Sequence, residues 1–467
     1  MPVAIWWLRR DFRLSDNPAL HAARSLAKTV YAAFCLDELE GLNPRQRAFA
    51  VGSLVQLRSE IEKSDATVSA LGGTPSGALL AACKRLGAVA VVAARSYDAA
   101  ARDVESEVER ALLGEGIELI RAPGDVLHEP EIVAERKRAA DGGYRVFPPF
   151  YDAWRALKVG EPLSQTLPNG RDPQPGAFPD VPDVAEPKPG ERAASDQQRR
   201  FVSARAASYA FMGAYPAADG TSKLSAYLRF GCLSPRALHR AVHERMAKSW
   251  TLAPERAAMT EFLRRLALRD FFMQLAYFEP RMHDEPLQAK MRGFPYAQDE
   301  RLLSVWREGR TGYPLVDAAM RQLAASGYVH QRAATCAASF CCFDLGLDWR
   351  AGRDVWMSEL LAADPALCDG NWQWIAGVGS DQAAYPRVYN PITQSRLIDP
   401  QSVYVRRWVR ELAKLPTGAA LTPWALSRQQ QTELGFFTPE QYPPPVVDHR
   451  SAARAMLSKY QSFRQRS

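Results

Sequence analysis

The first third of the chain alternates short apolar runs with segments of helical periodicity. Apolar runs of strand length occur at 3–8, 29–36, 88–94 and 117–121. Between them, apolar positions recur at helical spacing over 44–63, 76–86 and 97–115. Such short continuous runs are typical of parallel strands that are buried on both faces. The alternation therefore predicts an α/β domain with a doubly wound, Rossmann-like parallel sheet.

The middle of the chain is interrupted by proline and glycine. From about 158 to 200 these residues occur too often for a helix or an interior strand, so we expect an irregular segment there. From about 201 onwards helical patterns dominate. We therefore expect an α/β domain at 1–130, an interdomain linker at 131–200 and a mainly α-helical domain at 201–467.

The clearest helix of the second half begins in the string TGYPLVDAAMRQL at 311–323. Pro314 suits its first turn, the apolar residues that follow are at helical spacing, and Gly327 ends it. A second helix is expected from about Tyr328, with small Ala and Cys side chains that allow close packing. By themselves, these features describe a tightly packed helical core.

Length, net charge and the cysteine and histidine content limit the kinds of protein that the chain can be. At 467 residues the chain can form two domains with full cores, and its net charge of +7 has the sign that suits a polyanionic partner. The seven cysteines lie in apolar segments without disulfide or metal spacing, which favours a reducing cytoplasm. The seven histidines are dispersed, so no metal site is expected. No signal sequence or membrane-spanning stretch is evident, and we expect a soluble, cytoplasmic monomer.

Three strings together point to one class of chemistry. RRDFRL at 9–14 follows the first predicted strand where a dinucleotide-dependent dehydrogenase would have GxGxxG. With TGYPLVDAAMRQL and with GNWQW at 370–374, it resembles the DNA photolyase/cryptochrome family over nearly the whole chain. The resemblance implies an α/β antenna-type domain, a helical FAD-binding domain, FAD as cofactor and photochemistry in blue light.

The resemblance also implies which residues bind the flavin. GTSKLS at 220–225 has hydroxyls and helix-start N–H groups that suit the FAD diphosphate. Many relatives have Arg where this chain has Lys223, so a point charge replaces a planar fork. The full set of implied FAD contacts is Tyr209, Thr221, Ser222, Lys223, Leu224, Ser225, Phe262, Arg269, Gln331, Arg332, Asp364 and Cys368.

Cys368 matches the family position beside flavin N5. Photolyases commonly have Asn there, plant cryptochromes Asp and insect cryptochromes Cys. Because a thiol is a weak proton donor, with an ordinary pKa of about 8.5, we expect slow proton delivery to the flavin. The family's electron path matches Trp372 and Trp349, and its third tryptophan position is Tyr296.

The lesion pocket departs most from the family pattern. The carboxylic acid position is Arg265, the two stacking tryptophan positions are Leu268 and Tyr328, and the methionine position is Thr335. Two further polar positions near the flavin are Ala334 and Ala362. The histidine pair of the (6-4) photoproduct enzymes matches Gln331 and Thr335, with only His330 nearby. Standard dimer repair and (6-4) repair therefore both lack their usual residues.

A DNA-binding face and an antenna pigment are further implications. Arg332, Arg387 and the string RRWVREL at 406–412 could follow phosphates, although the three arginines of that string equally suit a solvated helix face. Antenna contacts are expected around Phe34, Cys35 and Leu36 and in the helix after Asn43. The sequence leaves folate, deazaflavin, another flavin or an empty antenna site open.

Three classes of function follow. The first is a cryptochrome-like blue-light photoreceptor with light-driven electron transfer, DNA as a partner and a signalling partner of unknown identity. The alternative is a DNA photolyase that repairs UV-induced pyrimidine dimers through a non-standard pocket. The third is a nucleotide- or DNA-binding protein without photochemistry, which a flavin absorbance spectrum would exclude. The replaced repair residues favour the first class.

Overall fold

The computed structural model describes residues 2–137, 142–180, 184, 186–380 and 386–466. Contacts between Cα atoms divide the chain into two units, one made of residues 1–207 and 222–280 and the other of residues 208–221 and 281–467. In the described ranges, no helix combines the length and the apolar content needed to cross a membrane. The division of the sequence at 130 and 200 stays a prediction.

The first unit contains a five-stranded parallel sheet with the order β3-β2-β1-β4-β5. Its strands are β1 Val3–Trp7, β2 Thr29–Cys35, β3 Val68–Leu71, β4 Ala90–Ala94 and β5 Glu118–Ala122. The doubly wound, Rossmann-like α/β fold is thereby confirmed. Strand β3 is an addition to the four predicted strands, because its four-residue run contains Ser69 and is too short to stand out as apolar.

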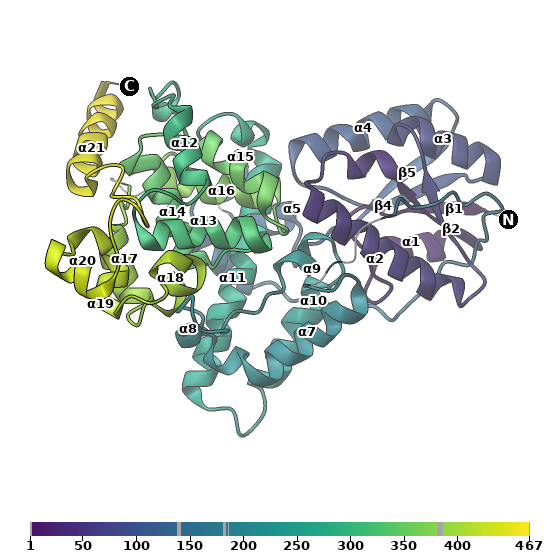
Figure 1. The fold of residues 1–467 in the computed structure, drawn as a ribbon. Helices are drawn as coiled ribbons and strands as arrows, with labels where there is room; N and C mark the ends of the chain where they lie inside the picture. Colours follow the sequence, from purple (N-terminus) through teal and green to yellow (C-terminus); the bar gives the residue numbers. More distant parts are fainter. Residues whose placement is uncertain (1, 138–141, 181–183, 185, 381–385, 467) are drawn as a thin grey trace. The chain divides into compact units, whose positions relative to one another are not determined.

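Helices cover both faces of this sheet (Figure 1). They are α1 Pro18–Leu26, α2 Pro44–Glu62, α3 Pro75–Leu86 and α4 Ala99–Leu113. Alternate strand residues such as Ile5 and Trp7 join Leu79 of α3 and Val108 of α4 in one buried cluster. Because successive strand residues point to opposite faces, both faces must be apolar, which is why the strands are continuous hydrophobic runs.

The charged string RRDFRL forms a buried network after β1. Asp11 accepts from the indole N–H of Trp6 at 2.9 Å and from the backbone N–H of Arg9 at 3.0 Å. Arg9 pairs in turn with Glu38 and Glu105. Buried charges are tolerated only when they are paired and hydrogen-bonded, so this string holds the ends of the strands together.

The remaining helices of the first unit are α5 Pro130–Ala134, α6 Phe147–Arg155, α7 Glu191–Ala204, α9 Ser225–Arg229, α10 Pro235–Met246 and α11 Ala253–Phe278. Helix α7 begins inside the stretch that we expected to be irregular, so that expectation is wrong for its last residues. The Pro- and Gly-rich run ends at Gly190, and the segment after it lacks both residues and buries Ala194 and Phe201. It is therefore free to form a helix.

The second unit is helical, as predicted (Figure 1). Its helices are α8 Tyr209–Met212, α12 Glu300–Arg307, α13 Pro314–Ser326, α14 Gln331–Ser339, α15 Trp349–Glu359, α16 Pro365–Ala376, α17 Pro391–Ile398, α18 Val403–Trp408, α19 Thr417–Leu421, α20 Arg428–Leu434 and α21 His449–Arg466. A π-helical turn, Phe340–Asp344, continues α14. Both helices predicted around Gly327 are present, and Gly327 caps α13 with a left-handed φ of 63°.

Asp317, in the string TGYPLVD, stabilises the loop in which α13 begins. Asp317 is fully buried and accepts from the backbone N–H groups of Thr311 and Gly312, at 2.8 and 3.1 Å, and from the Thr311 hydroxyl at 2.6 Å. The Tyr442 hydroxyl also donates to Asp317. One carboxylate thus ties the loop before α13 to the C-terminal part of the unit.

Candidate flavin and electron-transfer site

A tight turn of the first unit carries residues 222–225 of the predicted phosphate segment. Lys223 has a φ of +54°, and Leu224 after it has φ −95° and ψ −5°. Successive residues of opposite hand turn their backbone N–H groups to one side, an arrangement that binds anions. The side-chain amide of Gln197 donates to the Ser222 carbonyl at 2.7 Å and holds the turn. The local geometry suits a phosphate.

Helix α11 positions the next predicted flavin residues. Arg269 is only 8% exposed; its guanidinium donates to the Asp125 carbonyl at 2.6 Å and pairs with the Asp125 carboxylate. It also reaches the Leu228 carbonyl of α9 at 3.4 Å, so it links α11 to the helix that follows the phosphate turn. Phe262 packs against Phe201 with ring centroids 4.6 Å apart and the rings tilted by 51°. Arg269 therefore positions the turn through α9.

The two lesion-pocket positions of α11 lie on its outer side. Arg265 is exposed and forms an ion pair with Glu261, one turn earlier, at 2.9 Å. Leu268 is half-buried. Glu261 escaped the sequence comparison because it is four residues before the acid position of the family. Its carboxylate nevertheless stands beside the Arg265 guanidinium, so the local charge is balanced and not simply inverted.

In the second unit, two predicted residues meet directly. The hydroxyls of Thr221 and Tyr328 are 3.2 Å apart, and this hydrogen bond joins the end of the phosphate segment to the loop after α13. His330 braces the same region, because its Nε2 lies 3.0 Å from the Gly213 carbonyl and its Nδ1 accepts from the Arg332 backbone N–H at 3.2 Å. Burial lowers the pKa of His330 to about 4. A neutral, fully engaged His330 supports the loop and is not placed as a catalytic acid.

Helix α14 presents polar groups at its start and small buried ones behind. Gln331 and Arg332 are exposed, Thr335 is half-buried, and Ala334 is buried. The Thr335 hydroxyl donates to the Gln331 carbonyl at 2.9 Å, one turn back in the same helix. The amide and guanidinium of the first turn are therefore exposed donors, whereas Thr335 is already engaged.

Helix α16 carries Asp364 and Cys368. Asp364 is buried and accepts from the Leu367 backbone N–H at 3.3 Å as the cap of the helix, and Cys368 is 8% exposed. The next residue, Asp369, belongs to a cluster that the sequence did not reveal. It accepts from Arg353 at 2.9 Å and lies 3.0 Å from Nδ1 of His283, whose pKa it raises through this hydrogen bond. No local signal in CDGNWQW points to partners from 283 and 353.

The tryptophans of the predicted electron path lie on two neighbouring helices, Trp349 on α15 and Trp372 on α16. The ring of Trp372 contacts Trp356 at a centroid distance of 5.0 Å and Trp306 at 6.0 Å. Among the described residues, no ring contact joins Trp349 to Trp372 or to Tyr296. The described rings that contact Trp372 are thus those of Trp356 and Trp306, and the path through Trp349 stays a prediction.

Tyr296, at the third position, is half-buried and packs on Phe294 with ring centroids 4.8 Å apart. Burial raises the pKa of its phenol well above the usual value, with a further contribution from Cys342. The role of Tyr296 as terminal electron donor stays a prediction.

The arginines predicted to contact DNA divide into two groups. Arg387 and Arg407 are exposed, as is Arg410. Arg406 instead donates to the backbone carbonyls of Gln401 at 2.7 Å and of Ser402 at 3.3 Å. It is committed to closing its own helix, so only the other arginines of RRWVREL are available to phosphates.

The predicted antenna positions follow β2. Phe34 and Cys35 are buried in the sheet, whereas Leu36 is half-buried. Asn43 caps α2 by accepting from the Gln46 backbone N–H at 2.9 Å. Of the three predicted residues around the end of β2, Leu36 alone is not fully buried, and the start of α2 after Asn43 is also partly exposed.

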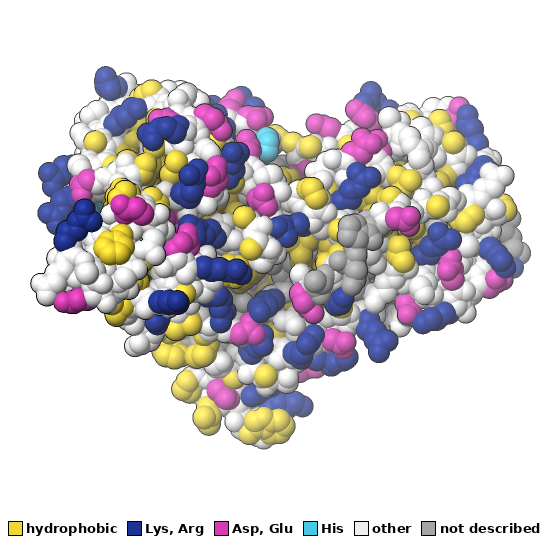
Figure 2. All heavy atoms as spheres, viewed as in Figure 1, with side chains coloured by type: hydrophobic (Ala, Val, Ile, Leu, Met, Phe, Trp, Pro, Cys, Tyr) yellow, Lys and Arg dark blue, Asp and Glu magenta, His cyan; other side chains and the backbone are white. Residues whose placement is uncertain are grey.

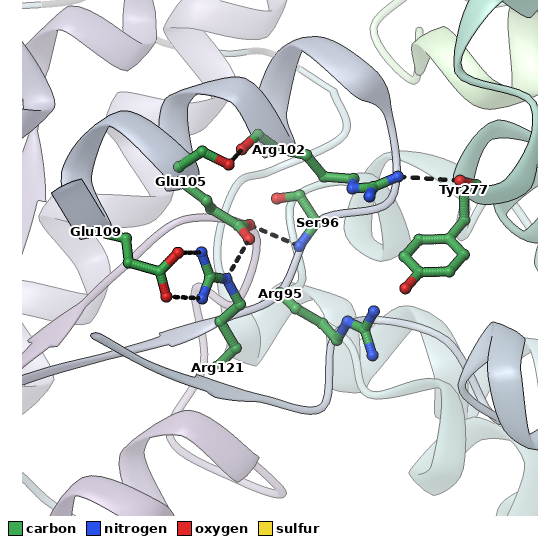
Figure 3. A pocket seen from close by; sticks show the side chains of 8 residues that line it. Arg95, Ser96, Arg102, Glu105, Glu109, Arg121 and Tyr277 are labelled. Carbon is green, nitrogen blue, oxygen red and sulfur yellow. Dashed lines mark hydrogen bonds and ion pairs between the residues drawn. The ribbon is translucent and has the colours of Figure 1, made fainter. Parts of the chain in front are cut away.

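A polar pocket of the first unit lies beyond the ends of β4 and β5 and was not predicted (Figure 3). Glu109 holds Arg121 through two hydrogen bonds of 2.7 and 3.0 Å. The guanidiniums of Arg95 and Arg102 lie 5.1 and 4.5 Å from the ring centroid of Tyr277. Because its guanidiniums are already paired or stacked, the pocket braces α4 and α11 against the sheet. In the parts of the chain that are described, no cluster of His, Cys, Asp and Glu could hold a metal ion.

Comparison with known proteins covers both units. A family model described as the FAD binding domain of DNA photolyase matches residues 262–462, and one described as DNA photolyase matches residues 4–169. The chain is 31% identical to the deoxyribodipyrimidine photo-lyase of Alkalihalophilus pseudofirmus over 97% of this chain and 96% of that protein.

Two solved structures are similar over almost their whole length. A class III photolyase from Agrobacterium tumefaciens has a TM-score of 0.87 and 29% identity, over 99% of this chain and 98% of that one. A cryptochrome from Synechocystis has a TM-score of 0.87 and 27% identity, over 98% of both chains. The same fold is thus shared with a repair enzyme and with a protein titled a cryptochrome.

The residues of each unit fit an FAD. The first unit offers the anion-binding turn at Lys223. The second offers the exposed donors of Gln331 and Arg332, the buried Asp364 carboxylate and a small thiol at Cys368. FAD supplies absorption of blue light and the ability to accept one electron, and these side chains would bind and orient it.

Proposed function

Because the chain belongs to the DNA photolyase/cryptochrome family and has FAD as its cofactor, we propose that it is a light-driven flavoprotein with cryptochrome-like output. With FAD bound, the buried Trp372 and Trp349 would supply the electron that the flavin accepts in blue light, and this change would regulate a partner. The observation that carries this proposal is the make-up of α11, where Arg265 is ion-paired to Glu261 and Leu268 replaces an aromatic ring.

The chemistry of dimer repair explains why α11 decides between the functions. A flipped-out pyrimidine dimer needs aromatic surfaces to stack on and an acid that hydrogen-bonds to its carbonyl as negative charge develops there. Leu268 can make apolar contacts but has no aromatic ring on which a base could stack. The Thr335 hydroxyl already donates a hydrogen bond to the Gln331 carbonyl. The Glu261 carboxylate is engaged with the Arg265 guanidinium, one turn later in the same helix. These replacements support the proposal that the output is not standard dimer repair.

DNA is proposed as a partner on the basis of exposed arginines. Arg332, Arg387, Arg407 and Arg410 are exposed, whereas on the face seen in Figure 2 basic side chains are mixed with acidic and hydrophobic ones. Binding should follow counterion release, so the affinity for duplex DNA should fall steeply with salt. Replacing Arg387 by Gln should reduce the slope of log affinity against log salt by about 1. A salt-independent affinity would remove DNA from the proposal.

Repair of dimers through a rebuilt pocket is the second candidate. It is favoured by the Glu261 carboxylate, which sits one turn from the usual acid position, and by the similarity to a deoxyribodipyrimidine photo-lyase along the whole chain. In this reading Glu261 would have to leave Arg265 and meet the lesion in its protonated form.

One experiment separates the two candidates. The flavin-reduced protein is illuminated with blue light without oxygen, with dimer-containing single- and double-stranded oligonucleotides, and restored pyrimidines are counted. The variant Glu261→Gln and a dark sample serve as controls. Multiple turnovers that are lost in the dark and in Glu261→Gln would establish repair. No turnover in a sample whose FAD is photoreduced would support the sensing function.

A further inference from the structure

We propose that the exposed face of α21 is a second surface for nucleic acids, which binds their phosphate backbone and adds to the arginines proposed above to contact DNA. Helix α21, His449–Arg466, contains five Arg or Lys residues and no Asp or Glu. It therefore carries a charge of +5 with its histidine neutral, whereas the whole chain has a net charge of +7. Most of the excess positive charge of the protein is thus concentrated in these 18 residues.

The exposed arginines of α21 have no acidic partner. Arg450, Arg454 and Arg466 are exposed, and none of them forms an ion pair within the described part of the chain. Other exposed arginines are neutralised locally, as Arg155 is by Asp152 at 2.9 Å. A guanidinium without a carboxylate partner keeps its charge and its paired N–H donors for a phosphate. The face is therefore suited to a polyanion.

The stability of the helix does not account for all of these charges. Arg464 and Arg466 lie in the last turn, where a cation interacts favourably with the helix dipole. Arg450 is the second residue of α21, and a cation in the first turn opposes the dipole. Asp448, which precedes the helix, accepts from the backbone N–H of Ser451 at 2.9 Å. A partner therefore explains the position of Arg450 better than the helix itself does.

The composition of the exposed face identifies the kind of partner. Met456 and Tyr460 are buried against the unit, and Phe463 packs edge-on against Phe294 with ring centroids 5.3 Å apart. Because this apolar side is occupied, α21 cannot insert it into a lipid bilayer. The exposed residues of the helix are Arg450, Ser451, Arg454, Ala455, Ser458, Lys459, Gln461, Ser462, Gln465 and Arg466. They provide no large apolar side chain for the core of a protein interface, whereas Arg, Lys, Ser and Gln are residues that contact phosphates.

The surface lies away from the start of α14, where Arg332 is. Helix α21 is joined to the π-helical turn at the other end of α14, because His449 pairs with Asp344. The helical residues between Arg332 and Asp344 span roughly 15–18 Å. Figure 1 shows α21 along the outside of the other helices of the second unit. A nucleic acid on α21 therefore contacts the protein at a second place.

Two triple variants with the same change in net charge test the inference. The first replaces the unpaired arginines of α21 by Gln, at Arg450, Arg454 and Arg466. The second replaces three exposed but ion-paired arginines by Gln, at Arg155, Arg171 and Arg199. Binding of labelled duplex DNA, single-stranded DNA and RNA of one sequence to the FAD-bound proteins is measured by fluorescence anisotropy over a range of salt concentrations. The slope of log affinity against log salt should become shallower by about 2–3 in the first variant and by less than about 1 in the second.

The three nucleic acids and two further measurements separate the outcomes. A change in slope confined to RNA, or to DNA, identifies which of the two supplies the phosphates and supports the inference. Equal changes in the two triple variants would reveal an effect of net charge alone and would overturn it, as would an unchanged slope in the α21 variant. Loss of binding to a polyglutamate peptide in that variant, with the affinity for nucleic acids kept, would identify an acidic protein as the partner and would also overturn it.

The variant Arg387→Gln tests the DNA contact of the proposed function separately. A slope that changes in Arg387→Gln and not in the α21 variant refutes the second surface alone, and the reverse result refutes the contact at Arg387 alone. Melting temperature and FAD content are measured first; they should be unchanged, because Gln has nearly the same helix propensity as Arg. If the triple variant is less stable, Arg450→Gln with Arg454→Gln is compared with Arg155→Gln and Arg171→Gln, and the same difference in slope is expected at about two thirds of its size.

Discussion

Replacement of Gly352 by alanine tests whether the packing around Trp372 is as tight as the structure shows. Gly352 lies in α15, and a Cβ added there would be 2.4 Å from Cη2 and 2.5 Å from Cζ3 of Trp372, and 3.1 Å from Sγ of Cys341. Trp372 is 1% exposed and is flanked by the rings of Trp306 and Trp356, so it cannot move alone.

The expected size of the effect follows from two opposing contributions. Forcing one methyl group into a well-packed core costs about 1–3 kcal/mol. Alanine gains about 1 kcal/mol over glycine in a helix interior. Because two rigid ring atoms lie within 3 Å of the new methyl group, we place the cost of overpacking at the upper end. The net loss in free energy of unfolding should be about 2 kcal/mol, or a melting temperature lower by about 4–8 °C.

The matched control is Gly418→Ala in α19, where an added Cβ would meet nothing within 4 Å. This change adds a methyl group near the start of a short helix without a clash, so it should leave the stability unchanged or raise it by up to about 1 kcal/mol. Thermal and urea unfolding of the FAD-bound proteins measure both variants. A Gly352→Ala protein as stable as Gly418→Ala would show that the ring of Trp372 can shift freely, and the reasoning about its contacts would be wrong.

Three further predictions concern stability, pH and repair. Asp317→Ala should lower the free energy of unfolding by about 3 kcal/mol or more in urea, because it leaves buried N–H and O–H donors without an acceptor, whereas Asp317→Asn should lose less. His330 has a pKa lowered from 6.5 to about 4, so its contribution to stability is complete above pH 6.5 and is lost as the pH falls toward 4; the acid-induced loss should shrink in His330→Asn, and identical pH profiles would contradict this. The double change Arg265→Glu with Leu268→Trp restores an acid and a ring to α11 and should raise dimer repair above that of the wild type in the illumination assay; unchanged repair would mean that the pocket is limited elsewhere.

The fold followed closely from hydrophobic periodicity. Four strands and the three helices predicted between them were found, since each of these segments carries its apolar pattern within a few residues. The errors were of two kinds. Strand β3 is short and contains Ser69, and α7 begins directly after Gly190, where the proline-rich composition stops. In both places, the average composition over a stretch of sequence mixes residues of two different structural segments, so the short element does not stand out.

The candidate site could be predicted only as far as linear motifs reach. The predictions for Lys223, Arg269 and Cys368 rest on strings that are continuous in the sequence. Glu261 and the cluster around Asp369 were missed, because their partners are one helical turn away or come from distant parts of the chain. A contact between residues that are far apart in the sequence, such as Asp369 with His283 and Arg353, leaves no pattern in a continuous segment.

The sequence alone determined the class of fold, the family and the cofactor, because these depend on local periodicity and on motifs that persist in linear order. Tertiary structure alone decided what surrounds the tryptophans that are proposed as electron donors. The contact of Trp356 with Trp372 and the two guanidiniums over Trp349 arise from the packing of α15 with its neighbours. Electron and proton transfer depend on distances between side chains and on the charges around them, and only the packed helices set those quantities.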